Sequence, residues 1–145
     1  MIAAVPDINI LVSALLSQHG PPGRIQAAWE RGEVLFILSQ PMLAKADDVL
    51  HRPYIFDAFS TPAIAEDRVQ RVLTLLNRKA LITPHVLDLK VVKEDPEDDT
   101  IIIAAVEGNA DCIISGDKHL KDLGSYKNIP ILTPAQFVEQ YHISE

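Results

Sequence analysis

Aspartates stand at three points of the sequence where a predicted strand ends or a predicted helix begins. Asp7 closes the first apolar run of the chain, and Asp117 follows a later apolar run after one glycine. Asp98 and Asp99 stand at the expected start of the helix that leads into that later run. In open parallel sheets, ligand sites form outside the carboxyl ends of the strands. We therefore expect these acids, distant in the sequence, to meet at one edge of a sheet.

Carboxylates gathered at one edge repel one another unless a cation lies among them, and hard oxygen ligands favour Mg²⁺ or Mn²⁺. Two such ions about 4 Å apart can stabilise the attacking and leaving oxygens of a phosphodiester. Each polar residue also has a purely structural interpretation as a helix cap. Asp98 or Asp99 can cap the helix that they begin. Asp117 can cap a short helix through Leu123, and Asn9 can cap the first helix.

The elements that would position these acids follow a regular order. Five apolar runs are continuous rather than alternating, which is typical of strands buried on both faces of a parallel sheet. The runs are Ile2–Val5, Val34–Leu38, Ala80–Ile82, Cys112–Ile114 and Ile129–Leu132. Helical patterns lie between them. The helices are expected from Asn9 to Leu16, from Pro22 to Trp29, after Ser39, after Thr61, from Asp98 or Asp99 to near Gly108, and after Thr133. This alternation predicts an α/β fold with a mainly parallel sheet.

Length and composition limit the classes of protein to consider. A chain of 145 residues has the size of one domain, so we expect residues 1–145 to form a single domain. The net charge of -7 argues against binding nucleic acid through overall positive charge, although a small basic rim or metal ions could still do so. The longest apolar stretch, Ile101–Val106, is too short to span a membrane. The single cysteine, Cys112, excludes an internal disulfide framework, and with no signal-peptide pattern we expect a cytoplasmic protein.

Several motifs resemble those of the PIN domain family. Residues 7–15, which begin Asp-Ile-Asn and continue with apolar residues, are similar to the opening signature of PIN domains, usually Asp-Thr-Asn. Residues 95–99 and 114–120 resemble the later motifs of that family. Ser39, residues 49–53 and residues 131–134 match the subgroup of toxin components of toxin–antitoxin systems, the VapC-like toxins. The resemblance extends from about Met1 to Phe137.

This resemblance implies a single PIN-like domain with a central, mainly parallel, five-stranded sheet flanked by helices. It implies cleavage of phosphodiester bonds, usually in RNA, by an endonuclease that depends on Mg²⁺ or Mn²⁺. It also implies a homodimer, in line with the apolar segment Tyr54–Phe59, and an antitoxin protein as a partner.

Position by position, the resemblance implies specific site residues. The three catalytic and metal-binding acids would be Asp7, Asp98 and Asp117. The second of these is chosen by counting back from Ala105, with Asp99 as the alternative, whereas Asp95 is expected to be a turn residue. Asn9 and Ser115 would be supporting polar groups.

Two positions within the implied site depart from the family pattern, and at one of them Ile8 replaces the usual small hydroxyl residue. The family normally has a glutamate on the third helix, and the matching residue here is Lys45. Asp48 lies one helical step away and could reach the site in part. Lys45 lies at the margin of an apolar stripe, where a lysine ordinarily extends toward water. Alternatively its ammonium lies among the acids and weakens the binding of divalent cations.

Basic residues provide candidate contacts to a phosphate backbone. Lys118 and His119 directly follow Asp117 and are expected to lie nearest the substrate. Arg24, Arg52 and Lys121 are further candidates, and for every one of these residues a solvated surface charge is the simpler interpretation.

Two other kinds of protein compete with a nuclease. An aspartyl-phosphate enzyme fits poorly, because Asn9 stands where a haloacid dehalogenase needs a second acid, and residues 83–85 lack the phosphorylatable acid of a response regulator. The second alternative is a catalytically degenerate PIN-fold module that binds nucleic acid or protein, and Lys45 favours it.

Overall fold

A computed structural model describes residues 1–92 and 95–144 of the chain. Six strands form one sheet in the order β3-β2-β1-β4-β6-β5. The strands are β1 (Ile2–Pro6), β2 (Val34–Ser39), β3 (Leu81–Thr83), β4 (Cys112–Ile114), β5 (Ser125–Tyr126) and β6 (Ile129–Leu132). Five of them are parallel and correspond to the five predicted runs, so the α/β prediction is confirmed. The sixth, β5, is antiparallel to β6 and was not predicted, because two residues carry no hydrophobic pattern.

The described part of the chain has eight helices, of which seven lie between strands and α8 follows the last strand. They are α1 (Ile8–Leu16), α2 (Pro21–Glu30), α3 (Gln40–Leu50), α4 (Pro53–Phe56), α5 (Pro62–Lys79), α6 (Pro96–Glu107), α7 (Lys118–Leu123) and α8 (Pro134–Gln140). Ser39, Thr61 and Thr133 cap α3, α5 and α8 as the sequence predicts, since each hydroxyl accepts a backbone N–H from the first turn.

Two predicted helix starts are wrong. Asp7, and not Asn9, caps α1, because its carboxylate accepts the N–H of Asn9. Asp95 caps α6 and Pro96 occupies its first turn, so α6 begins before Asp98 and Asp99 rather than at them. Proline is well suited to a first helical turn, where its missing N–H has no partner to lose. Asp98 and Asp99 consequently lie within the first turn of α6, where both are buried.

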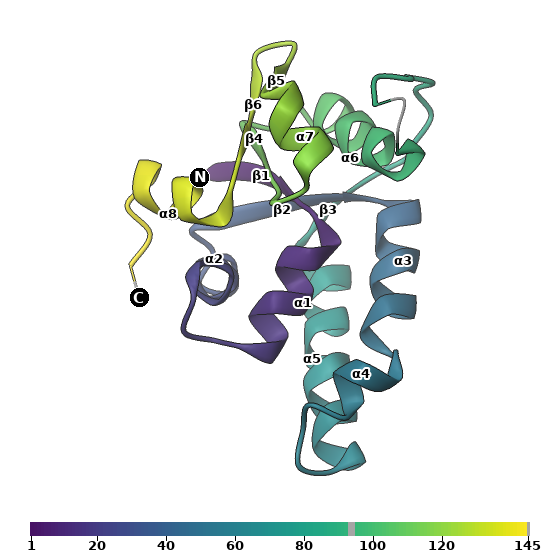
Figure 1. The fold of residues 1–145 in the computed structure, drawn as a ribbon, viewed down its shortest axis with the longest axis vertical. Coiled ribbons are helices and arrows are strands. Elements are labelled where there is room, and N and C mark those ends of the chain that lie inside the picture. Colours follow the sequence, from purple (N-terminus) through teal and green to yellow (C-terminus); the bar gives the residue numbers. More distant parts are fainter. Residues whose placement is uncertain (93–94, 145) are drawn as a thin grey trace.

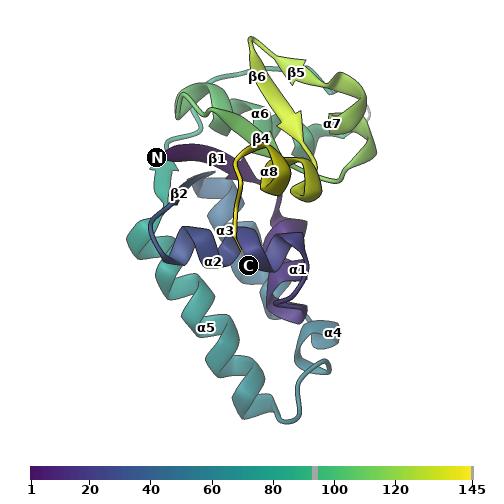
Figure 2. The same ribbon diagram turned by 90° about the vertical axis from the view of Figure 1, so that its left-hand side faces the viewer.

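The helices cover both faces of the sheet (Figures 1 and 2). Helix α6 lies on one face, while α1, α2, α3 and α5 lie on the other. Residues Ile101–Ala105 of α6 are all buried, and this helix packs against β1, β2 and β4. A helix that is apolar on nearly all sides needs such a covered position. Its burial holds the first turn of α6 beside the carboxyl ends of β1 and β4.

The chain changes direction across the sheet between β1 and β4. From β1 it proceeds to β2 and β3 on one side, and β4 and β6 then lie on the other side of β1. Pro6 of β1 pairs with Ile114 of β4, so these two central strands end at the same level. Such a switch point leaves a crevice at the carboxyl ends of the strands.

Other expectations have mixed outcomes. Cys112 of β4 is a free cysteine and is fully buried. The segment Tyr54–Phe59 is not a continuous exposed apolar patch, because Tyr54 is exposed but Ile55 is fully buried. Across the residues described, no helix combines the length and the apolar character needed to cross a membrane.

Candidate metal centre

Asp7 and Ser115 lie side by side where β1 and β4 end. The backbone N–H of Asp7 donates to the carbonyl of Ile114 at 2.9 Å, which fixes the end of one strand against the other. The fully buried hydroxyl of Ser115 donates to Oδ2 of Asp7 at 2.9 Å and accepts the N–H of Asp117 at 3.0 Å. Ser115 therefore orients both strand-end acids, in the supporting position that the sequence predicts for it.

Three aspartates form the tightest acidic cluster in the described residues. One carboxylate oxygen from each of Asp95, Asp98 and Asp117 lies within 4.8 Å of the others. Asp95 and Asp98 come from the start of α6, and Asp117 comes from the end of the loop after β4. Asp117 also caps α7, because its Oδ1 accepts the N–H groups of His119 and Leu120. Asp117 can therefore cap α7 and belong to the acidic cluster at the same time.

The environment of Asp98 strongly disfavours a negative charge. The side chain is only 5% exposed. Burial, a hydrogen bond with Asp117, and the charges of Asp117, Asp95 and Asp7 raise its pKa to about 8. Burial alone would also raise the pKa of Asp117, but hydrogen bonds from Asp98, Leu120 and His119 outweigh it and lower that pKa. The opposite pKa shifts favour a protonated Asp98 beside a charged Asp117 near neutral pH.

One oxygen of this cluster has no donor. Among the described residues, Oδ2 of Asp98 is a buried atom for which no hydrogen-bond partner is found. A buried acceptor without a donor is unfavourable by about 1–3 kcal/mol. Either a shared proton or a cation satisfies it, and three carboxylate oxygens form the donor set that Mg²⁺ and Mn²⁺ prefer. The residues present therefore fit a divalent cation.

Asp99, the alternative to Asp98, points away from this cluster. Its Oδ1 accepts the backbone N–H groups of Val91 and Val92 at 2.8 and 2.7 Å. It thereby anchors the segment that precedes α6, and Val92 is buried while Val86, earlier in the same segment, is 76% exposed. The structure thus gives Asp99 a structural contact and places Asp98 in the cluster.

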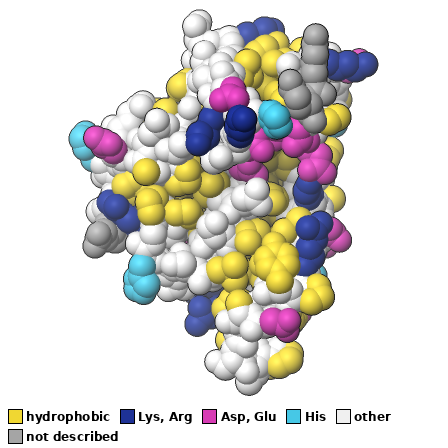
Figure 3. Space-filling view, viewed as in Figure 1, with side chains coloured by type: hydrophobic (Ala, Val, Ile, Leu, Met, Phe, Trp, Pro, Cys, Tyr) yellow, Lys and Arg dark blue, Asp and Glu magenta, His cyan; other side chains and the backbone are white. Residues whose placement is uncertain are grey.

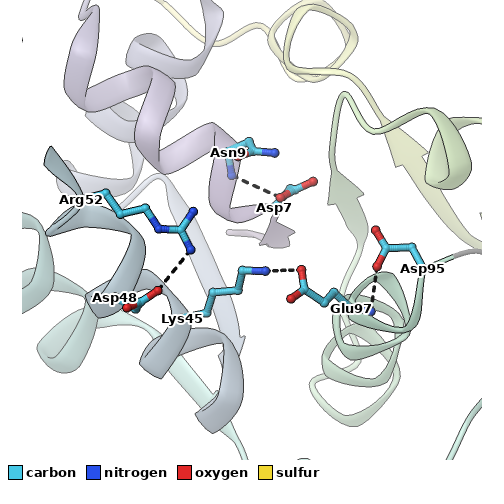
Figure 4. A network of polar contacts seen from close by, with 7 residues as sticks. All are labelled: Asp7, Asn9, Lys45, Asp48, Arg52, Asp95 and Glu97. Atoms are coloured by element: carbon cyan, nitrogen blue, oxygen red, sulfur yellow. Dashed lines mark hydrogen bonds and ion pairs between the residues drawn. The ribbon is translucent and has the colours of Figure 1, made fainter. Parts of the chain in front are cut away.

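A cavity of about 370 Å³ opens beside the acids. Asp7, Asp95, Asp98 and Asp117 line one side of it. Lys45 and Arg52 line the other, and the Lys45 ammonium forms an ion pair with Glu97 at the start of α6 (Figure 4). Lys45 therefore neither extends freely into water nor pairs with Asp7, Asp98 or Asp117 among the described residues.

A family model for the PIN domain matches residues 3–119 of this chain. The chain belongs to the PIN domain family. The uncharacterized protein MJ1680 of Methanocaldococcus jannaschii is 26% identical over 148 residues, which cover 97% of this chain and 92% of that protein. PIN domains are generally metal-dependent nucleases, and the aspartate cluster fits that chemistry.

Two polar candidates, Asn9 and Asp48, lie in different places in this PIN domain. Asn9 lines the cavity, and its backbone N–H, not its side chain, contacts Asp7 (Figure 4). Asp48 does not line the cavity; its carboxylate is exposed and pairs with Arg52 at 3.2 Å. Asp48 therefore does not replace the missing glutamate of α3.

The predicted basic contacts are divided between two places. Lys118 and His119 are exposed at the start of α7, outside the residues that line the cavity, as is Lys121. Arg24 of α2 is distant from the acids and donates to the carbonyl of Ile143. Figure 3 shows acidic side chains in the upper part of the molecule, with basic side chains to either side over α7 and α3.

The sequence interpretation missed Asp95 and Glu97. Asp95 was interpreted as a turn residue, yet residues three apart at a helix start lie on the same face, so Asp95 accompanies Asp98. The three-residue spacing between Asp95 and Asp98 is therefore enough to predict from the sequence that Asp95 lies near the site. No sequence pattern indicates Glu97, because its pairing with Lys45 depends on how α3 and α6 approach one another across the site.

Proposed function

We propose that this PIN domain is an endoribonuclease that cleaves phosphodiester bonds in RNA with Mg²⁺ or Mn²⁺. The observation that carries the proposal is the buried oxygen of Asp98, which lacks a neutral donor and lies in a cluster of three aspartates. The cluster lies at the carboxyl ends of the two central strands, where open α/β sheets bind ligands.

Asp95, Asp98 and Asp117 would hold the cation, with Asp7 beside them. When bound, a divalent cation supplies Lewis acidity toward phosphate oxygens and water. The protein supplies orientation: Ser115 fixes Asp7, and the N–H groups at the start of α7 fix Asp117. Because the pKa of Asp98 is raised to about 8, a cation held by this carboxylate near neutral pH would take the place of its proton.

A cleavage assay tests the proposal. The purified protein is incubated with a labelled single-stranded RNA and Mn²⁺, and a parallel sample contains EDTA. Cleavage is expected only with Mn²⁺, and Asp98→Asn should lower its rate by about 100-fold or more because a metal-binding charge is lost. Asp122→Asn, which changes an exposed acid of α7 outside the cavity, is the matched control. EDTA-resistant cleavage, or full activity in Asp98→Asn, would refute the proposal.

A second candidate function is a PIN-fold module that binds nucleic acid or protein without cleaving it. Lys45 is the observation that favours it, because this residue places a cation where the family normally has an acid. Cleavage that is absent in the wild type but present in Lys45→Glu would support this second function over the first.

We also propose a cytoplasmic toxin of a toxin–antitoxin pair, acting as a homodimer. The proposal rests on residues 49–53 and 131–134, which match the toxin subgroup. Co-purification with the product of an adjacent reading frame, and a mass of twice the protomer by light scattering, test the partner and the dimer. A monomer that co-purifies with no such product would contradict both.

A further inference from the structure

The cavity has two sides of opposite charge. The acidic side consists of Asp7 and the Asp95, Asp98 and Asp117 cluster, from the ends of β1 and β4 and the start of α6. The basic side consists of Lys45 on α3 and Arg52 just after that helix. Figure 4 shows Lys45 and Arg52 approaching from α3, with Asp7 and the start of α6 opposite. We call the second set the basic side.

The contacts of the basic side are exposed and easily exchanged. The side chains of the Lys45–Glu97 pair are 38% and 69% exposed, and those of the Arg52–Asp48 pair are 51% and 74% exposed. Exposed ion pairs of this kind stabilise a protein by about 0–1 kcal/mol. Neither cation is therefore held firmly by its present partner, and each can turn to a ligand that enters the cavity.

A phosphate of a nucleic acid backbone fits the space between the two sides. Each phosphate carries one negative charge, which Lys binds as a point charge and Arg binds through its planar fork. The acidic side by itself repels such a strand, so a cation held there and the basic side must act together. With a net charge of -7, this local pair of cations is the means by which an acidic protein can still hold RNA.

We propose that Lys45 and Arg52 bind backbone phosphates of single-stranded RNA, with Lys45 exchanging Glu97 for the phosphate as the strand enters. The inference rests on the proposed function and assigns a substrate-binding role to the residue that replaces the usual glutamate. Glu97 competes with RNA for Lys45 and so limits the affinity of the site for RNA.

Fluorescence anisotropy of a labelled single-stranded RNA tests this assignment. Ca²⁺ replaces Mn²⁺ because it takes the same oxygen ligands, and a gel verifies that the RNA stays intact. Lys45→Met and Arg52→Met should each weaken binding about tenfold and reduce the dependence of log K on log salt by about 0.7. Glu97→Gln should strengthen binding about threefold, because it frees Lys45. Lys127→Met, at an exposed lysine outside the cavity, should leave binding unchanged.

Each contrary outcome has a distinct meaning. Equal affinities for Lys45→Met and Lys127→Met, or a wild type that does not bind RNA, would overturn the inference. Displacement of the RNA by polyglutamate at the same charge concentration would overturn it in favour of an acidic protein segment. Weakened binding by Lys45→Met in a protein that cleaves nothing with Mn²⁺ would support the inference while refuting the nuclease. Mn²⁺-dependent cleavage together with unaltered RNA binding in Lys45→Met and Arg52→Met would support the nuclease and overturn the inference.

Discussion

Asp98 and Lys45 line the same cavity from opposite sides, yet the fold treats them differently. Asp98 is 5% exposed, and burial and three neighbouring acids raise its pKa to about 8. The Lys45 side chain is 38% exposed and forms one exposed ion pair. Packing thus holds the acidic side chains close together although their negative charges repel one another. The cations of the basic side are exposed, and their present ion pairs contribute little to the stability of the fold.

This contrast separates the functions of the two sides. Fixed acids with an unfavourable charge gain most from a small cation that enters between them. Exposed cations gain most from a large anionic ligand that replaces a weak partner. The following predictions test this division, beginning with the largest expected effect.

Removal of the Asp98 charge should stabilise the metal-free protein at high pH. With the pKa of Asp98 raised from 3.8 to about 8, the folded state keeps a proton that the unfolded state loses, so stability falls as pH rises across this range. In EDTA, Asp98→Asn should raise the free energy of unfolding by about 2–4 kcal/mol at pH 9, and by little at pH 4. Urea unfolding of both proteins at several pH values measures this. Parallel pH curves would show that Asp98 carries no such charge penalty.

Asp95→Asn should separate helix capping from metal binding. Asparagine caps a helix as well as aspartate does, so the free energy of unfolding should not fall. The loss of one carboxylate from the cluster should weaken Mn²⁺ binding about tenfold or more, corresponding to at least about 1.4 kcal/mol. Calorimetric titration and urea unfolding of the same samples measure both quantities. Unaltered Mn²⁺ affinity would restore the interpretation of Asp95 as a turn residue alone.

Asp99→Asn should lower stability and leave Mn²⁺ binding unchanged, which is the reverse of the effects expected for Asp95→Asn. An amide oxygen is a weaker acceptor than a carboxylate for the N–H groups of Val91 and Val92, so the free energy of unfolding should fall by about 1–2 kcal/mol. Mn²⁺ affinity should stay the same, because this side chain points away from the cluster. Asp122→Asn is again the control. A large loss of Mn²⁺ affinity would instead make Asp99 a ligand.

Lys45→Glu should produce the smallest effect. Replacing a cation near the acids by an acid should increase Mn²⁺ affinity about three- to tenfold, an effect reduced by solvent screening at this exposed position. Calorimetric titration at low salt, with Lys127→Glu as the control, measures it. Identical affinities in the wild type and Lys45→Glu would mean that Lys45 does not influence metal binding.

The parts of the site that the sequence predicted are those that follow directly from strand ends. Asp7 and Ser115 directly follow paired strands, and parallel strands bring their carboxyl ends to one edge. Apolar runs locate those strands, so the α/β fold and the meeting of Asp7, Asp98 and Asp117 at one cavity followed from the pattern. Whether Asp98 or Asp99 entered the cluster depended on one position of helical phase, which the resemblance supplied.

The parts of the structure that the sequence did not predict depend on how separate elements pack. The Lys45–Glu97 pair joins α3 to α6, two helices on opposite faces of the sheet that meet only beyond its edge. No periodicity along either helix encodes that approach. Strand β5 is two residues long and pairs through its backbone, and Ile55 is buried by the local turn of α4, so neither has a signature in residue type.

The hydrogen bond from Ser115 to Asp7 joins residues that are 108 positions apart. A ribosome that has synthesised β1, β2 and all the helices up to α5 has produced neither the start of α6 nor β4, which pairs with the end of β1 that leads to Asp7. The acids therefore assemble only after translation has passed Asp117, since Asp7 is held by Ile114 and Ser115 at the end of β4. A nascent chain built in this way has no complete acidic cluster until its synthesis has passed that point.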